Sequence, residues 1–348
     1  MDNIIINGKT LGRGHAPFIV AEAGINHNGE IDKAFEMIHI AKITGVNAIK
    51  FQTFKAKEIV ADSKLMYTYK SQGKEITESQ YEMFNRCEFS REEWFKIKHK
   101  CDEEKISFFS TPQNKTDLDL LLDLGVTAIK VGSDDLINFP LLRSYSTTKL
   151  PMIISGGMSN LAEISEALDT IGAFDGYPTI LLHTTSQYPT PPEDVNLEKL
   201  KTLSGAFHDI PLGFSDHTQG LLASSLAVVY GAIFFEKHFT LDHNLPGPDH
   251  WFSEDPQGLK QWSDSIKEAY KMLGSKLVRP TKNEIIIKKE ARRKIVAIKK
   301  IKCGELYTSE NISMRRISQG IGLPPSLYDI LLGKIANRNY NLGESIEL

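Results

Sequence analysis

The sequence contains little cysteine and no long apolar run. Its three cysteines, Cys87, Cys101 and Cys303, are far apart among 348 residues and form no CxxC motif. This spacing argues against a disulfide framework or a zinc ribbon and is typical of a reducing cytosol, so we expect a cytoplasmic protein. No apolar stretch approaches the roughly 18–20 residues of a membrane span. No basic segment precedes an apolar run at the N-terminus, so we expect neither a membrane anchor nor a signal peptide.

The phosphate-binding loops of nucleotide enzymes are also absent, since the chain has no GxGxxG and no GxxxxGK[ST] motif. The net charge is only −3, but residues 286–348 carry 12 Lys and Arg against 6 Asp and Glu. A basic tail can indicate nucleic-acid binding. This tail has no recognisable nucleic-acid motif, however, and its basic residues alternate with apolar ones. We expect no nucleic-acid partner, and we expect a solvated face or a surface that meets the acidic remainder of the chain or an anionic ligand.

Short β-rich runs alternate with helical patterns in the first part of the chain. Eight runs are nearly continuous in apolar residues before a polar end, as strands buried on both faces are. They are residues 18–23, 47–53, 106–111, 127–133, 151–157, 179–185, 211–215 and 232–239. Apolar spacing predicts a helix over residues 31–45, and Asn160 with Glu163 predicts a capped helix start. The alternation predicts an α/β fold, a (β/α)8 TIM barrel. A doubly wound open sheet is the alternative, which the missing phosphate loops disfavour.

Other segments lie outside this repeat. Residues 54–90 and 239–255 exceed ordinary connection lengths, and long loops in compact domains are usually lids or binding loops. A polar linker over residues 274–285 ends the predicted barrel domain, residues 1–273. Residues 286–348 contain short β-like runs and are too few to bury a large core alone. We therefore expect a small β-rich domain that docks on the barrel or on a second subunit.

Two lysines each close an apolar run, in both cases with the sequence AIK. Lys50 and Lys130 should lie at the carboxyl ends of strands, the face where TIM barrels keep their chemistry. A buried ammonium group is costly without an anionic partner, so each should meet an acid or a ligand. Two cations with several small donors suit a phosphate and a carboxylate together. The donors at other strand ends are Ser110, Thr111, Ser133, Ser155 and Ser215.

Two histidines end neighbouring strand runs. His217, in GFSDHTQG, and His238, in FFEKHFTLDH, are 21 residues apart, about one strand–helix–strand step. Each stands beside a carboxylate, Asp216 or Glu236, and such a pair can hold a divalent metal. A lone barrel histidine such as His183 is as readily a core residue. Two imidazoles with water and substrate oxygen suit Mn²⁺, and also Mg²⁺, Co²⁺ or Zn²⁺.

Several motifs occur in order along nearly the whole chain. They are IVAEAGINHNG, AIKFQTFKA, STP, IKVGS, GFSDHT and EKHFTLDHNLPGPDH, followed by the basic, β-rich tail. Each motif alone is weak, but together they resemble the sialic acid (N-acetylneuraminate) synthase family. The resemblance implies a barrel synthase domain over residues 1–273 and an antifreeze-like (SAF) domain over residues 286–348.

The resemblance also implies a reaction. Enzymes of this family condense phosphoenolpyruvate with an open-chain N-acetylated aminohexose of the N-acetylmannosamine type, and release phosphate by C–O cleavage. A divalent metal, usually Mn²⁺, is held by the histidines that match His217 and His238 and activates the sugar aldehyde. The product is a nine-carbon α-keto acid, so we expect an N-acetylneuraminate (nonulosonic acid) synthase. A legionaminic acid synthase that uses 2,4-diacetamido-2,4,6-trideoxymannose is the alternative.

Individual residues receive roles from the same resemblance. Glu22 matches a carboxylate that handles protons or positions water for attack at C2. The residues that match phosphoenolpyruvate-binding positions are Lys50, Thr111, Lys130, Ser133, Ser155, Ser186 and Ser215. Those that match positions near the sugar are Gln52, Asp135, Tyr188, Asp249 and Arg316. In the family the tail caps the barrel of the partner in a domain-swapped homodimer, which agrees with the opposite charges of tail and barrel.

Four departures from the family's usual residues concern the sugar more than the reaction. Asp135 stands where many members have Glu, and Ser186 stands where Asn is usual. Gly156 replaces the Thr of STGM, and the stretch from Arg316 reads RISQGI where RPGNGI is usual. The change from Glu to Asp moves a carboxylate by one methylene, and the loop of Arg316 loses its proline.

Three other interpretations of these residues stay open. A catalytically silent sugar-binding protein would keep the tail but lose the metal pair or the lysines, all of which are present here. The lysines can instead form structural ion pairs with Glu22 or Asp135. A lysine can also form a Schiff base with a carbonyl substrate, as in aldolases, although two lysines beside a metal pair favour an anion site.

Overall fold

The structure is a computed structural model that describes residues 3–12, 14–318 and 321–347. The chain divides into two compact units, residues 1–274 and residues 275–348. Within the described ranges, no helix has both the length and the apolar character needed to cross a membrane.

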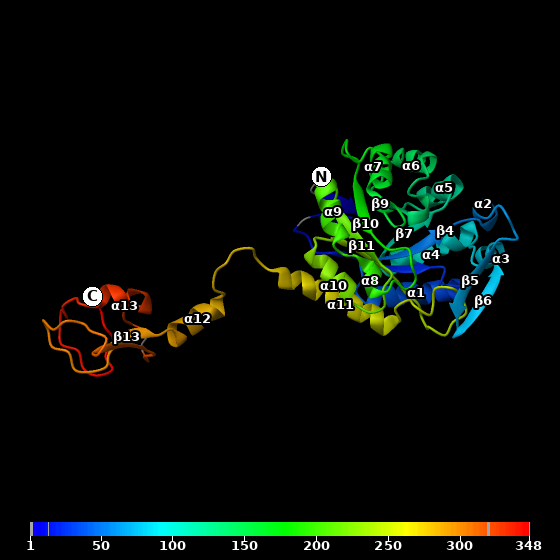
Figure 1. Ribbon diagram of the computed structural model, residues 1–348. Helices are drawn as coiled ribbons and strands as arrows, with labels where there is room; N and C mark the ends of the chain where they lie inside the picture. Colours follow the sequence, from blue (N-terminus) through cyan, green and yellow to red (C-terminus); the bar gives the residue numbers. More distant parts are fainter. Residues whose placement is uncertain (1–2, 13, 319–320, 348) are drawn as a thin grey trace. The chain divides into compact units, whose positions relative to one another are not determined.

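Eight parallel strands form a nearly closed barrel in the first unit (Figure 1). They follow one another around the sheet in chain order: β3 (Phe18–Gly24), β4 (Ala48–Thr53), β7 (Ser107–Pro112), β8 (Ile129–Val131), β9 (Met152–Ser155), β10 (Thr179–His183), β11 (Leu212–Asp216) and β12 (Phe234–His238). The two ends of the sheet, β7 and β8, lie side by side. The predicted TIM-type barrel is confirmed, and the doubly wound alternative is wrong, because there the strand order reverses partway across the sheet.

At least one helix follows every strand and packs on the outside of the barrel. The helices are α1 (Ile31–Ile43), α4 (Arg91–Glu103), α5 (Lys115–Asp123), α6 (Phe139–Ser146), α7 (Leu161–Thr170), α8 (Pro192–Val195), α9 (Lys199–Ala206), α10 (Leu222–Val229) and α11 (Pro256–Leu273), with a 3-10 turn η1 (Ser133–Asp135) after β8. The helix predicted over residues 31–45 is α1. The predicted cap of α7 is also confirmed, since the Asn160 side chain accepts hydrogen bonds from two backbone amides and Glu163 accepts one from the Asn160 amide.

Alternation along the strands divides the barrel interior into an apolar and a polar layer. Inward-pointing side chains recur at every second residue of a strand. The apolar layer contains Val20, Ala48, Phe109, Ala128, Ile153, Leu182 and Phe234. Two residues further on, toward the carboxyl end, the same strands carry polar side chains: Glu22, Lys50, Thr111, Lys130, Ser155, Thr184 and Glu236. The fold therefore collects these polar groups at one end of a dry core.

A β-hairpin that sequence analysis did not predict contributes to the other end of the barrel. β1 (Asn3–Ile6) pairs antiparallel with β2 (Lys9–Gly12). The turn is Asn7–Gly8, and both residues have positive φ. Asn-Gly is a strong hairpin signal in a sequence, because both residues tolerate this conformation. The buried side chains of the hairpin belong to the same cluster as the apolar layer, so they complete the dry half of the interior.

Residues 54–90, predicted to be a long loop, fold into defined elements. They contain α2 (Ala56–Ile59), the antiparallel pair β5 (Met66–Ser71) and β6 (Lys74–Ser79), and α3 (Gln80–Asn85). All residues of the second long segment, 239–255, are described, and they contain no helix and no strand longer than an isolated bridge.

The second unit has its own small core. It begins with α12 (Lys282–Ala291), which starts inside the segment predicted as a linker. β13 (Lys294–Ala297) pairs antiparallel with β14 (Ile312–Arg315), and η2 (Pro325–Leu327) and α13 (Tyr328–Leu331) follow. The core residues are Ile295, Ala297, Ile301, Tyr307, Ile312, Leu331, Ala336, Tyr340 and Ile346.

Added volume at Gly213 in β11 should destabilise the barrel. A Cβ there would lie 2.4 Å from Leu182 Cδ2 and 2.6 Å from the carbonyl oxygen of Phe234. Overpacking of this kind costs about 1–3 kcal/mol, so Gly213→Ala should lower the free energy of unfolding by that amount in urea titrations. Gly205→Ala in α9 is the control, because a Cβ at Gly205 meets no atom within 4 Å. Equal stabilities of the two variants would contradict the packing argument.

Candidate active site

A cavity of about 620 Å³ opens at the carboxyl ends of the barrel strands. The structure brings most of the predicted site residues together in its lining: Glu22, Lys50, Gln52, Thr111, Lys130, Ser133, Ser155, Ser186, Tyr188, Ser215, His217 and His238. They come from every part of the barrel, as expected when polar residues end successive strands. The polar layer of the interior therefore forms the floor of one cavity.

Two lysines and two glutamates are buried on this floor. Lys50 Nζ lies 2.9 Å from Glu22 Oε2 and 3.7 Å from Glu236 Oε1. Lys130 Nζ lies 3.9 Å from the same Glu236 oxygen. All four residues are at most 5% exposed. The cluster is balanced, two positive against two negative charges, which is what burial of so many ions requires.

Small hydroxyl groups complete the surroundings of the two ammonium groups. Lys130 donates to Ser155 Oγ at 2.7 Å and to its neighbour's backbone carbonyl, while Lys50 lies 3.3 Å from Thr111 Oγ1. Sequence analysis left open that the lysines form structural ion pairs with Glu22 or Asp135, and the contact between Lys50 and Glu22 is such a pair. Asp135 takes no part in such a pair, since it accepts a hydrogen bond from Asn138.

Burial and charge move the pKa values of the two lysines in opposite directions. Burial lowers the pKa of Lys130 to about 8, and Glu236 offsets only part of this effect. Burial would lower the pKa of Lys50 too, but Glu22 and Glu236 together outweigh it, so that this pKa is raised. Lys50 is therefore a permanent cation, whereas Lys130 can lose its proton near neutral pH.

The carboxyl group of Glu22 has polar surroundings that affect its protonation. Burial raises the pKa of this carboxyl group, although Lys50 opposes the shift. Its Oε1 accepts a hydrogen bond from the Gln52 amide at 3.1 Å. A Cβ built on Gly24, which has a φ of +53°, would touch Glu22, Gln52 and Asp249 at 3.4–3.8 Å. These are ordinary van der Waals distances, so it is the positive φ that favours glycine at this position. Glu22 is a carboxyl group that can hold or release a proton.

The two predicted metal-binding histidines lie side by side, with ring centroids 5.5 Å apart. Burial lowers the pKa of His217 to about 4 and that of His238 well below its usual value, so both rings are neutral. His217 Nδ1 lies 2.8 Å from the Thr185 carbonyl oxygen, which can only accept, so Nδ1 carries the hydrogen. The Tyr188 ring packs 4.1 Å from the His217 ring.

The surroundings of His238 fit a metal ligand. Its buried Nδ1 has no hydrogen-bond partner among the described atoms, and Asp249 Oδ2 lies 3.8 Å away, too far for a hydrogen bond. Glu236 Oε2 is likewise buried without a partner. Within the part of the chain that the structure describes, no group of three or more His, Cys, Asp or Glu side chains is arranged to hold a metal ion. The two imidazoles would therefore need water or substrate oxygen to complete a coordination sphere.

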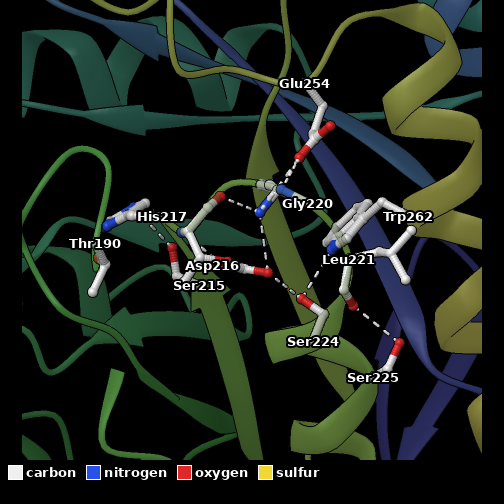
Figure 2. A network of polar contacts seen from close by, with 12 residues as sticks. Thr190, Ser215, Asp216, His217, Gly220, Leu221, Ser224, Ser225, Glu254 and Trp262 are labelled. Carbon is white, nitrogen blue, oxygen red and sulfur yellow. Dashed lines mark hydrogen bonds and ion pairs between the residues drawn. The ribbon is translucent and has the colours of Figure 1, made fainter. Parts of the chain in front are cut away.

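The neighbouring residues Asp216 and Lys237 face away from the cavity, because successive residues of a strand point to opposite sides. Figure 2 shows Asp216 directed toward Ser224 and Trp262, with His217 on the other side. Ser224 donates to Asp216 Oδ2 at 2.6 Å and accepts from Trp262 Nε1 at 2.8 Å, and Lys237 Nζ lies 3.2 Å from the same Asp216 oxygen. Asp216 therefore anchors the carboxyl end of β11, which His217 directly follows.

Three predicted residues of the first unit, Ser110, Asp135 and Asp249, do not line the cavity. Ser110 Oγ lies 2.7 Å from Thr53 Oγ1 instead. Asp135 lies in η1, and its neighbour Asp134 is in the lining instead. Asp249 Oδ2 lies 3.8 Å from His238 Nδ1. Arg316 belongs to the second unit, where its Nε donates to the Ala291 carbonyl oxygen at 3.0 Å. The departure predicted after Arg316 runs into residues 319–320, which lie outside the described residues.

Sequence reasoning missed several lining residues. They are Phe54, Ile59, Tyr67, Gln80, Phe84, Gln113, Asp134, Met158 and Thr184. Many of these come from the 54–90 segment, whose length alone signalled a binding loop. Thr184 could have been predicted, since it lies two residues beyond Leu182, which points into the barrel.

The protein is a parallel barrel with charged side chains buried at the carboxyl ends of its strands. These features define its class as a TIM-barrel enzyme. The chain matches the model of the NeuB family over residues 37–277, and it belongs to that family. Several of its relatives are named as synthases, and the chain is an enzyme of this family.

Relatives and a solved structure cover nearly the whole chain. It is 38% identical to N,N'-diacetyllegionaminic acid synthase from Legionella pneumophila, over 98% of this chain and 96% of that protein. It is 33% identical to N-acetylneuraminate-9-phosphate synthase from Homo sapiens, over 94% of this chain and 90% of that protein. The crystal structure of N-acetylneuraminic acid (sialic acid) synthetase from Leptospira borgpetersenii, in complex with citrate, is 31% identical, with a TM-score of 0.73. That match covers 83% of this chain and 97% of the solved one.

Removal of the Ser224 hydroxyl should weaken the anchor of β11. Ser224→Ala leaves the buried Trp262 N–H without this partner, while Asp216 Oδ2 keeps its contact with Lys237. An unsatisfied buried group costs about 1–3 kcal/mol. We expect that loss in the free energy of unfolding, measured by urea titration. Ser225→Ala is the control, because the Ser225 hydroxyl donates to the carbonyl oxygen of Leu221, the N-cap residue of α10, at an exposed position. It should change stability by less than about 0.5 kcal/mol. An undiminished stability of Ser224→Ala would show that the contacts are dispensable.

Proposed function

We propose that the chain is a nonulosonic acid synthase. C3 of phosphoenolpyruvate forms a bond to the aldehyde carbon of an open-chain N-acetylated aminohexose, water adds at C2, and the C2–O bond breaks to release phosphate. The observation that carries this proposal is the burial of two lysines, two glutamates and two neutral imidazoles around one cavity. The similarity to relatives named as synthases of such acids supports the reaction class.

Phosphoenolpyruvate would bind on the charged floor. Its phosphate and carboxylate suit the two ammonium groups of Lys50 and Lys130, with Ser155 and Thr111 as further donors. The entering anion adds negative charge beside Glu22. The raised pKa of Glu22 lets this carboxyl group take up a proton at that moment, which limits the repulsion. The same group can then hold a proton or a water molecule near C2.

His217 and His238 would hold the divalent metal, for which we propose Mn²⁺. A metal bound there would polarise the sugar aldehyde as a Lewis acid. The chain's own contribution is orientation, since the Thr185 carbonyl oxygen fixes the hydrogen of His217 on Nδ1. The lone pair of Nε2, which lies 3.4 Å from Ser215 Oγ, would then be the one that coordinates. Tyr188 packs against both rings and restricts their movement.

We also propose that the second unit is an antifreeze-like (SAF) domain. In a homodimer, Arg316 of the partner subunit would reach the N-acetyl group of the sugar. The charge of residues 286–348, with 12 basic and 6 acidic side chains, suits docking on the acidic remainder of another chain.

Loss of one imidazole should remove the metal. We expect His238→Asn to abolish Mn²⁺ binding in isothermal titration calorimetry and to lower phosphate release by more than about 100-fold. His243→Asn is the matched control, because the His243 side chain is 46% exposed and outside the cavity lining. EDTA should inactivate the wild-type enzyme, and added Mn²⁺ should restore it. Full Mn²⁺ affinity in His238→Asn would refute the assignment.

The pH dependence should report the charge on Lys130. This lysine is positive below its pKa of about 8 and neutral above it. The kcat/KM for phosphoenolpyruvate reflects ionisations of the free enzyme, so it should fall about tenfold per pH unit above about pH 8 as the ammonium group is lost. Lys130→Arg should remove this decline, because a guanidinium stays protonated. If both profiles decline alike, another group is responsible.

A further inference from the structure

Two buried charges that the proposed reaction does not use lie behind the histidine pair. Asp216 precedes His217 in the chain and Lys237 precedes His238, and the parallel ladder of β11 and β12 pairs Asp216 with Lys237. Both are buried, and neither lines the cavity. A buried ammonium group is costly, so its presence outside the cavity calls for a role other than ligand binding.

The ammonium group of Lys237 meets oxygen atoms from three different residues. It donates to the Thr218 carbonyl oxygen and lies 3.2 Å from Asp216 Oδ2 and 3.7 Å from Glu254 Oε1. Among the described residues, Lys237 is the only cation in ion-pair contact with either carboxylate. Two of the three oxygens belong to the residues directly before and after His217. A side chain of β12 therefore holds the chain on both sides of the histidine that follows β11.

Asp216 strengthens this hold on the backbone around His217. Its Oδ1 accepts hydrogen bonds from the Thr218 amide at 2.9 Å and from the Thr218 hydroxyl at 2.7 Å. Thr218 is thus bound by Asp216 at its amide and hydroxyl and by Lys237 at its carbonyl group. The three residues form a clamp, and His217 projects from the middle of it toward the cavity.

Glu254 extends the clamp to His238. Glu254 Oε1 accepts a hydrogen bond from the Gly220 amide at 2.9 Å, a contact that Figure 2 shows. The backbone amide of the same residue donates to the His238 carbonyl oxygen at 2.9 Å. Lys237 is also the residue before His238. The two histidine backbones are therefore joined by two routes, one through the Lys237 side chain and one through Glu254.

The spacing of the two imidazoles matters because so few protein groups could share a metal with them. The part of the chain that the structure describes contains no group of three or more His, Cys, Asp or Glu side chains arranged to hold a metal ion. A binding site must hold its ligands within about 0.5 Å of the productive geometry. An error in the separation of the rings, whose centroids are 5.5 Å apart, would not be corrected by a third protein ligand.

We infer that Lys237 is a positioning residue that sets the separation of His217 and His238 from outside the barrel. The inference rests on the proposed function, in which these histidines hold a divalent metal. It adds to that site a residue that touches neither the metal nor a substrate and that acts through the clamp of Asp216 and Thr218.

The charge of Lys237 and its position predict opposite effects on metal binding. An ammonium group repels a divalent cation, so removal of the charge alone should tighten the binding of Mn²⁺. Loss of positioning should weaken the binding instead, by about 10–100-fold, the usual effect of changing a residue that orients a metal ligand. The direction of the change therefore separates positioning from simple electrostatics.

The test variant is Lys237→Met, because methionine keeps most of the apolar part of the side chain and removes the ammonium group. Isothermal titration calorimetry of the full chain with Mn²⁺ should show an affinity at least about tenfold weaker than that of the wild type. Leu142→Ala is the control for lost stability, because Leu142 is fully buried on α6. This control should lower the midpoint of urea unfolding and keep the Mn²⁺ affinity. Unchanged or tighter Mn²⁺ binding by folded Lys237→Met overturns the inference.

A milder variant decides the question if Lys237→Met does not fold. Thr218→Val removes the hydroxyl that donates to Asp216 and nearly keeps the shape of the side chain. We expect weaker Mn²⁺ binding here too, by a smaller factor. Thr147→Val is the matched control, because the exposed Thr147 hydroxyl donates only to the Ser144 carbonyl oxygen in the described contacts, and it should bind Mn²⁺ as the wild type does. Wild-type affinity in Thr218→Val would then count decisively against the clamp.

Failure of this inference is distinguishable from failure of the proposed metal site. If the wild-type protein binds no Mn²⁺, the proposed site is wrong and the inference falls with it. If the wild type binds Mn²⁺ and folded Lys237→Met binds it equally well, the site stands and only the role of Lys237 is wrong.

Discussion

The mutual neutralisation of Glu22, Lys50, Lys130 and Glu236 is the constraint on which the active site depends. Each ion would be costly alone in the barrel interior, and only their proximity makes burial tolerable. The four residues come from four strands, and the register of the sheet sets their spacing. Glu22 is paired directly with Lys50 in the ladder between β3 and β4. A shift of one residue in either strand would turn one of them out of the cavity.

Because side chains alternate along each strand, residues that line the cavity and residues that support the barrel from outside are neighbours in the sequence. Ser215, His217, Glu236 and His238 face the cavity. Between them stand Asp216 and Lys237, which form an outward-facing ion pair joined to α10 and α11. Adjacent residues thus have different roles. A carboxylate next to a histidine in the sequence, as Asp216 is next to His217, can face the opposite side of the sheet.

Much of the site could be predicted, and the reasons for success and failure are physical. Apolar runs with a polar end revealed all eight barrel strands, and a closed parallel barrel sends their ends to a single mouth. The direction of side chains just beyond a strand was not predictable in the same way. η1 turns Asp134 into the lining where Asp135 was expected. The β5–β6 hairpin is largely exposed, so it lacks the apolar alternation that marks a half-buried strand.

The 54–90 segment is an insertion after one strand, and it supplies much of the outer wall of the cavity but none of its charged floor. The wall and the floor are therefore encoded in separate stretches of the chain. Descendants of such a gene could exchange or remodel this insertion and admit a different ligand, while the charged floor passes unchanged from one lineage to the next.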